Sequence, residues 1–177
     1  MLKRRERITV KIPLEKIQEG IGISLRKCEE HLSGAEVLIE KDFINDAVAL
    51  IEFAIEEFGR AVYLRERLQM GSGTIEESLE TSHQLKYDKA FSVLPKELKT
   101  IWEGFSYFPK EYWGGGYWGE GYWGGRKETI SPRTRPNAIF THFDETTQTW
   151  QSGIRADEEI LRYIIDTLRG YIKNFKF

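Results

Sequence analysis

The stretch NDAVALIEFAIEEFGRAVYLRERLQM (residues 45–70) decides the fold. Its small and apolar residues recur at the three- and four-residue spacing of an α-helix, namely at Ala47, Leu50, Ile51, Ala54, Phe58, Ala61 and Leu68. Asn45 or Asp46 can cap the first turn, and the Gly-Ser-Gly at 71–73 ends the helix after Met70. The pattern therefore predicts one long amphipathic helix that packs on its neighbours.

The residues before this helix predict two more helices. Residues 1–13 are basic and partly β-branched, which favours a short extended arm. A short helix follows, and we expect Gly20 and Gly22 to end it. Ser24 is then a good N-cap for a long helix that reaches about Lys41.

Helical patterns are also present in the sequence that follows the central helix. Thr74 and Glu77 fit a capping box for a third long helix, which ends at Pro95. A shorter helix is expected over 96–105, and a strongly amphipathic one over 156–175. The fold class predicted is all-α, an up-and-down helical bundle with a long irregular Tyr/Trp/Gly-rich loop.

These changes of pattern divide the chain into four parts. They are an N-terminal arm with a short helix (1–23), a helical core (24–105), an aromatic glycine-rich insertion (106–136), and an extended segment around 137–143 followed by a helix that completes the bundle (137–177).

Composition narrows the class of protein. With 177 residues, 40% of them hydrophobic, the chain can bury a normal core, and its net charge of -2 gives no general attraction to nucleic acid or to an anionic membrane. The single Cys28 excludes an intrachain disulfide, and three histidines without cysteine partners argue against structural zinc. We find neither a membrane-spanning apolar run nor a signal peptide. We therefore expect a cytoplasmic protein with no metal, cofactor or membrane contact.

Some charged residues fall among apolar ones when each residue is advanced by about 100° around the helix. Glu57 lands inside the apolar arc of the central helix and Arg60 lies at its border, whereas Glu52 and Glu56 fall on the opposite, solvated side. In the helix expected from Thr74, the residues that fall in the arc include His83 and Lys86.

An unpaired buried charge costs several kcal/mol, so these groups should meet one another. We expect a polar cluster of Glu57, His83 and Lys86 between facing helices, with Arg60 and His31 nearby. One interpretation is a buried ion-pair network that fixes the helix register. The other is a site for proton transfer beside a phosphate, because metal-free RNA cleavage needs a base, an acid and a cation.

Two segments resemble a known family. EEHLSGAEVLIEKDFINDAVALIEFAIEEFGRAVYL (29–64), followed by SHQLKYDKAFSVLP (82–95), is similar to the AbiV-like branch of the HEPN superfamily, the abortive-infection proteins. The family's E-E-x-G-K signature appears here as E-E-F-G-R at 56–60, and its H-x-x-K motif is His83 and Lys86. RPNAIFTHFDETTQTW (135–150) loosely resembles a later extended segment of the family.

The resemblance implies a small helical bundle, often dimeric, that defends cells against phage or virus. We take from it the hypothesis of a protein that acts on RNA or the translation machinery, in its enzymatic form a metal-independent ribonuclease. His83 would be the general base or acid, Lys86 and Arg60 would stabilise phosphate, and Glu57 would orient His83.

Many HEPN ribonucleases use an R-x4–6-H motif, and this chain contains that string twice. Arg26 and His31 would point about 140° apart on one helix. Arg135 precedes a proline and shares a non-helical stretch with His142. His31, Arg135 and His142 are therefore secondary candidates.

The insertion contains YWGGGYWGEGYWGGRKE (112–128), with three Tyr-Trp-Gly units five residues apart. It is interpreted as a stacking surface for single-stranded nucleic acid, as a loop for partner binding or self-association, or as a repeat expansion without a function of its own. The candidate nucleic-acid or partner-binding residues are Tyr112, Trp113, Tyr117, Trp118, Tyr122, Trp123 and Arg126.

Two non-enzymatic alternatives stay open. In the first, the polar cluster is structural and function lies in a dimer face or in the Tyr-Trp-Gly loop. In the second, the chain is a helical subunit that neutralises a nucleotidyltransferase toxin.

Overall fold

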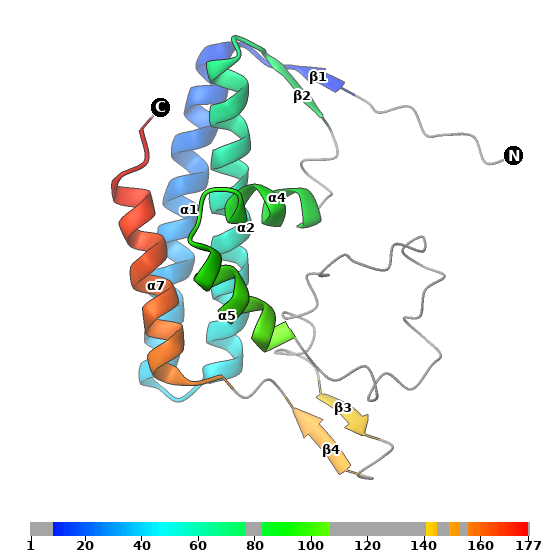
Figure 1. Ribbon diagram of the computed structural model, residues 1–177, viewed down its shortest axis with the longest axis vertical. Coiled ribbons are helices and arrows are strands. Elements are labelled where there is room, and N and C mark those ends of the chain that lie inside the picture. Colours follow the sequence, from blue (N-terminus) through cyan, green and yellow to red (C-terminus); the bar gives the residue numbers. More distant parts are fainter. Residues whose placement is uncertain (1–8, 77–82, 107–140, 145–148, 153–155, 177) are drawn as a thin grey trace, which may run out of the picture.

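The computed structural model describes residues 9–76, 83–106, 141–144, 149–152 and 156–176. The described helices are α1 (Leu14–Glu40), α2 (Ile44–Gln69), α4 (His83–Phe91), α5 (Lys96–Ser106) and α7 (Glu158–Lys173). The long helices α1 and α2 lie side by side, α7 packs against both, and α4 packs on α2 (Figure 1). The described part of the chain is therefore mostly helical, as the sequence predicts.

Two short antiparallel strand pairs accompany the helices. β1 (Thr9–Lys11) pairs with β2 (Thr74–Glu76), and β3 (Thr141–Asp144) pairs with β4 (Thr149–Ser152). The extended arm and the extended segment near residue 141 are confirmed where they are described. The helix predicted to start at Thr74 is wrong, because Thr74 to Glu76 form β2 and the described helix begins only at His83.

The helix break expected at Gly20 and Gly22 is also wrong. α1 continues through both glycines, and Ser24 is buried within the helix instead of capping it. A Cβ atom at Gly20 would lie 3.2 Å from a methyl carbon of Leu64, so this glycine lets α2 approach closely. Burial of Ile17 and Ile21 against α2 outweighs the low helix propensity of glycine, about 1 kcal/mol relative to alanine.

The main core lies between α1, α2 and the helices packed on them. α5 contributes Leu98 and Trp102, both fully buried. Asp157 caps the N-terminus of α7, and its side chain accepts hydrogen bonds from the backbone N–H groups of the first turn. The predicted last helix is confirmed, and its buried residues are Leu161, Ile164, Ile165 and Leu168.

Arg169 ties α7 to α1. Its Nε atom donates to Glu29 Oε1 at 2.7 Å, and its Nη2 atom donates to Glu36 Oε2 at 2.8 Å. Its Nη1 atom contacts the other oxygen of Glu36. The hydrogen bonds from Arg169 lower the pKa of Glu36 below its ordinary value.

Gly59 lets α4 lie directly on α2. A Cβ atom at this position would be 1.7 Å from the backbone carbonyl oxygen of Lys86. The middle of α4 therefore touches the backbone of α2, and a larger residue at position 59 would force the helices apart.

We predict opposite effects for two glycine substitutions. Gly59→Ala should destabilise the protein by about 1–3 kcal/mol or more, because α4 must move. Gly22→Ala should stabilise it by about 1 kcal/mol, since a Cβ there meets nothing within 4 Å. Urea unfolding of both variants measures the difference. Equal stability of the two variants would contradict the close contact at Gly59.

We also predict an acid-sensitive contact between α1 and α7. A carboxyl with a lowered folded-state pKa stabilises the protein above its unfolded pKa, near 4.5 for Glu36, and this contribution is lost as pH falls through the folded value. Arg169→Met should therefore lower stability at neutral pH and make it less sensitive to acidification below about pH 4.5. The control is Lys173→Met on the same helix, which should keep the wild-type pH dependence in unfolding measurements.

Candidate functional site

A polar cluster forms where α4 crosses α2. The Nδ1 atom of His83 lies 2.8 Å from Oε1 and 2.7 Å from Oε2 of Glu56. The Nζ atom of Lys86 lies 3.0 Å from the same Oε2. Because His83 and Lys86 are three residues apart on α4, both project from one face of the helix toward one carboxylate.

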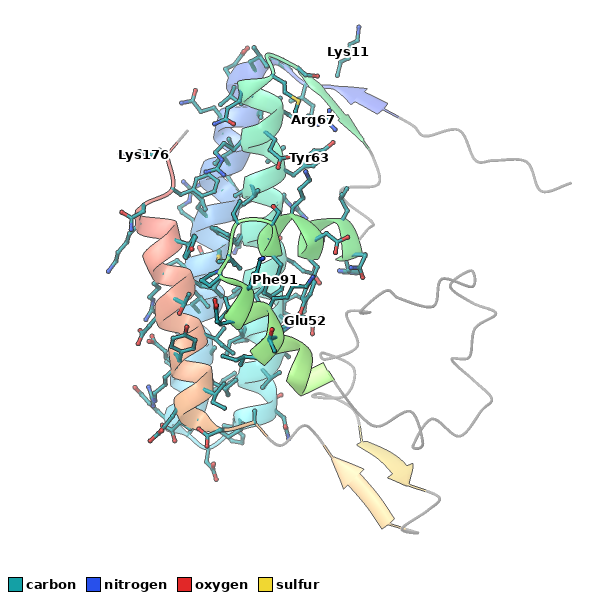
Figure 2. The ribbon with its side chains drawn as sticks, viewed as in Figure 1. Lys11, Glu52, Tyr63, Arg67, Phe91 and Lys176 are labelled. Atoms are coloured by element: carbon teal, nitrogen blue, oxygen red, sulfur yellow. The ribbon has the colours of Figure 1, made fainter. Side chains whose placement is uncertain are left out.

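The prediction that Glu56 and Glu52 are solvated is wrong. Glu56 is 3% exposed and Glu52, labelled in Figure 2, is 0% exposed. The apolar arc of α2 marks the side that packs on α1, but α4 covers another side of the same helix over Gly59. The side assigned to solvent is therefore a second helix contact.

Glu57, expected to be the buried partner of His83, has another position. Its side chain is partly exposed, and its Oε1 atom lies 3.6 Å from Nη2 of Arg60. Glu56, the preceding residue, holds the histidine instead. The helical wheel therefore predicts the wrong carboxylate, Glu57, which follows the true partner by one residue.

The three side chains of the cluster differ sharply in burial. The side chains of Glu56 and Lys86 are 4% and 5% exposed, whereas that of His83 is 42% exposed. The buried ion pair offsets the cost of taking each charge out of water. The imidazole forms the edge of the cluster, with part of its ring at the surface.

This geometry changes the role expected for Lys86. Its ammonium is held by Glu56 inside the α2–α4 contact, so it balances the carboxylate instead of facing a phosphate at the surface. Arg60 lies one helical turn after Glu56, and its side chain is 25% exposed. Of the predicted phosphate-binding cations, Arg60 is the one nearer to solvent.

His31 lies against a different part of α2. Its ring packs on Phe53, with 5.5 Å between ring centroids. Burial lowers the pKa of His31, and the nearby charge of Glu57 opposes this effect. Arg26 is exposed on the same helix. The structure therefore brings His31 close to Glu57 and not into the hydrogen bonds around His83.

The remaining sequence candidates cannot be placed in a site. Arg135 and the Tyr-Trp-Gly residues from Tyr112 to Arg126 lie outside the described residues. His142 belongs to β3, where it pairs in register with Gln151 of β4.

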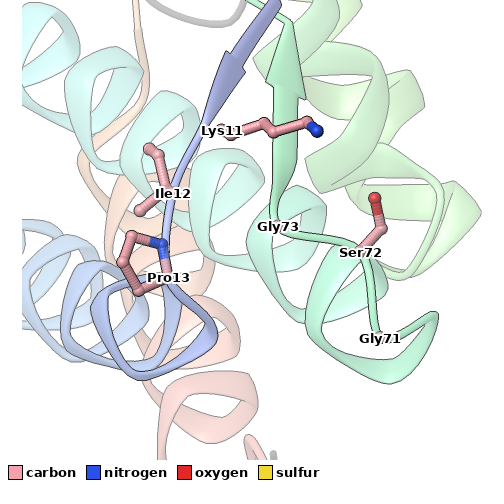
Figure 3. Close-up of a pocket in the computed structure, with 6 residues that line it drawn as sticks. All are labelled: Lys11, Ile12, Pro13, Gly71, Ser72 and Gly73. Carbon is pink, nitrogen blue, oxygen red and sulfur yellow. The ribbon is translucent and has the colours of Figure 1, made fainter.

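A shallow depression beside the C-terminal end of α2 offers no comparable chemistry. It is lined by Lys11, Ile12, Pro13, Gly71, Ser72 and Gly73 (Figure 3). The two segments that line this depression are joined by a backbone hydrogen bond, in which Ile12 N donates to Gly73 O at 2.6 Å. At 1.5 Å per residue, the fifteen residues from Glu56 to Gly71 correspond to about 22 Å along the helix axis.

Among the residues that the structure describes, no group of three or more His, Cys, Asp or Glu side chains is arranged to hold a metal ion. No helix in this part of the chain has the length and apolar character required to cross a membrane.

The chain was compared with known proteins. No protein-family model matches it, and no significant match was found among curated proteins or solved structures. The resemblance to AbiV-like HEPN proteins therefore stays a prediction from the motifs.

We predict that Glu56 and Glu57 differ strongly in their contribution to stability. Glu56→Ala leaves the Lys86 ammonium buried without its counter-charge, which should cost about 3–5 kcal/mol. Glu57→Ala removes a partly exposed pair and should cost about 1 kcal/mol or less. Chemical denaturation of both variants tests this, and a larger loss for Glu57→Ala would contradict the assignment of the buried carboxylate.

Proposed function

We propose that this chain is an AbiV-like HEPN defence protein that acts on RNA, with His83 as its acid–base group. The observation that carries the proposal is the half-exposed imidazole of His83, hydrogen-bonded to the buried carboxylate of Glu56. The two motifs that resemble the family, residues 56–60 and the His83/Lys86 pair, meet at this contact. By the same resemblance, we propose that it works as a cytoplasmic homodimer.

The proposed reaction is metal-independent cleavage of RNA. A base removes the proton of a ribose 2′-hydroxyl, and the oxygen attacks the adjacent phosphorus. The bond to the 5′-oxygen breaks, this oxygen takes up a proton, and the products are a 2′,3′-cyclic phosphate and a 5′-hydroxyl. His83 has the chemistry for the proton transfer, and Arg60 supplies a cation for the developing phosphate charge.

A second candidate function is supported by the burial of Glu56 and Lys86. Both side chains are almost completely covered, and Gly59 brings the helices into contact beneath them. In this alternative the cluster locks α4 onto α2, and the protein binds RNA or a protein partner without cleaving RNA. The Tyr-Trp-Gly loop would then be the candidate binding segment.

A cleavage assay separates the two functions. Wild type, His83→Ala and Gln84→Ala, each checked for folding, are incubated with labelled tRNA and mRNA in EDTA. We expect His83→Ala to cleave about 10²–10⁴-fold more slowly than wild type, the usual contribution of a positioned acid or base. Gln84, the next residue on α4, bonds to Asp88 and is the matched control, which should keep its activity.

Intact RNA with all three folded proteins would contradict the ribonuclease. Equal cleavage by wild type and His83→Ala would exclude His83 as the acid–base group. RNA binding without cleavage would favour the second candidate, and it should then be measured with and without residues 112–125.

A further inference from the structure

We infer that Glu56 is a positioning residue that fixes the proton of His83 on Nδ1, so that Nε2 is the atom that exchanges protons with a substrate. This inference rests on the proposed function for its role in catalysis. The position of the proton itself follows from the geometry and can be measured without RNA.

The hydrogen-bonding capacity of the two groups determines the tautomer. An ionised carboxylate has no proton to donate and can only accept. Both oxygens of Glu56 lie within 2.8 Å of His83 Nδ1, so this nitrogen must carry a proton. In a neutral imidazole, the other nitrogen, Nε2, then holds the lone pair of a base.

The surroundings of Nε2 agree with this role. The histidine side chain is 42% exposed. Within the part of the chain that the structure describes, Nε2 has no hydrogen-bond partner. A base must reach its substrate within hydrogen-bond distance, and this nitrogen is the ring atom not already engaged by the protein.

Lys86 and Gly59 make the orientation rigid. Lys86 holds Oε2 of Glu56 at 3.0 Å, so the carboxylate is fixed by two donors from the same face of α4. Gly59 sets the distance between the helix backbones. The three-residue spacing of His83 and Lys86 then has a physical reason: Lys86 orients the carboxylate of Glu56, and this carboxylate orients His83.

The nitrogen NMR spectrum of histidine-labelled protein tests the inference. Spectra are recorded at about pH 9, well above the ordinary titration range of imidazole. The His83 signals are assigned by their loss in His83→Ala. Free neutral histidine favours the proton on Nε2, so a dominant Nδ1–H form of His83 is the expected and diagnostic result.

The decisive variant is the double substitution Glu56→Met/Lys86→Met. It removes both charges together and keeps similar side-chain volume, a replacement that buried ion pairs often tolerate without loss of stability. We expect the Nε2–H form of His83 to dominate in this variant, and RNA cleavage to fall by about 10-fold or more. Glu57→Gln is the matched carboxylate control for the spectrum and should keep the wild-type tautomer.

A dominant Nε2–H form in the wild type would overturn the inference, as would an unchanged tautomer in the folded double variant. A pair that only holds the two helices together would leave the tautomer of His83 unchanged in the double variant. Failure of the proposed function is distinguishable, because it appears as absent or His83-independent cleavage, whereas the spectrum decides the proton position alone.

Discussion

The buried carboxylate of Glu56 is the constraint on which the α2–α4 half of the structure depends. A charge that is 3% exposed would cost several kcal/mol without partners, so the fold must bring cations or donors to it. Lys86 and His83 meet this need from one face of α4. They reach Glu56 because Gly59, one turn along α2, lets the helix backbones touch. The buried charge and the close approach at Gly59 together hold α4 against α2, beside the apolar contacts of Tyr87 and Ala90.

The sequence predicts α5 and α7 well because their apolar residues repeat at helical spacing and pack mainly on one side. The sequence pattern divides α1 wrongly, because the low helix propensity of glycine is a local property, whereas close packing of Leu64 against Gly20 is a tertiary one. The local pattern also places Thr74 in a helix, because it contains no sign of a strand partner. Its partner in β1 is Lys11, more than sixty residues earlier, and no local pattern predicts that pairing.

The candidate site was predicted in part. The positions of His83 and Lys86 on an apolar face correctly indicated that they need a partner, but the wheel chose Glu57. A wheel built from aliphatic residues finds one arc, and α2 is buried on more than one side. A signal for the second side was present, since Glu52, Glu56 and Gly59 follow one another at i, i+4 and i+7. Charges and a glycine carry no hydrophobic weight, so a helical wheel assigns this stripe to the solvated surface.

The two functional hypotheses differ in the role that they give to Nε2 of His83. In the structural alternative, Glu56 and Lys86 neutralise each other inside the contact between α2 and α4. His83 adds a hydrogen bond to this pair, and 42% of its side chain stays exposed. Stability therefore explains the buried pair and the hydrogen bond that His83 makes to Glu56. Proton transfer at the surface would need an imidazole that is held through Nδ1 and has Nε2 unoccupied by a described hydrogen bond, and our proposal for the function rests on this arrangement.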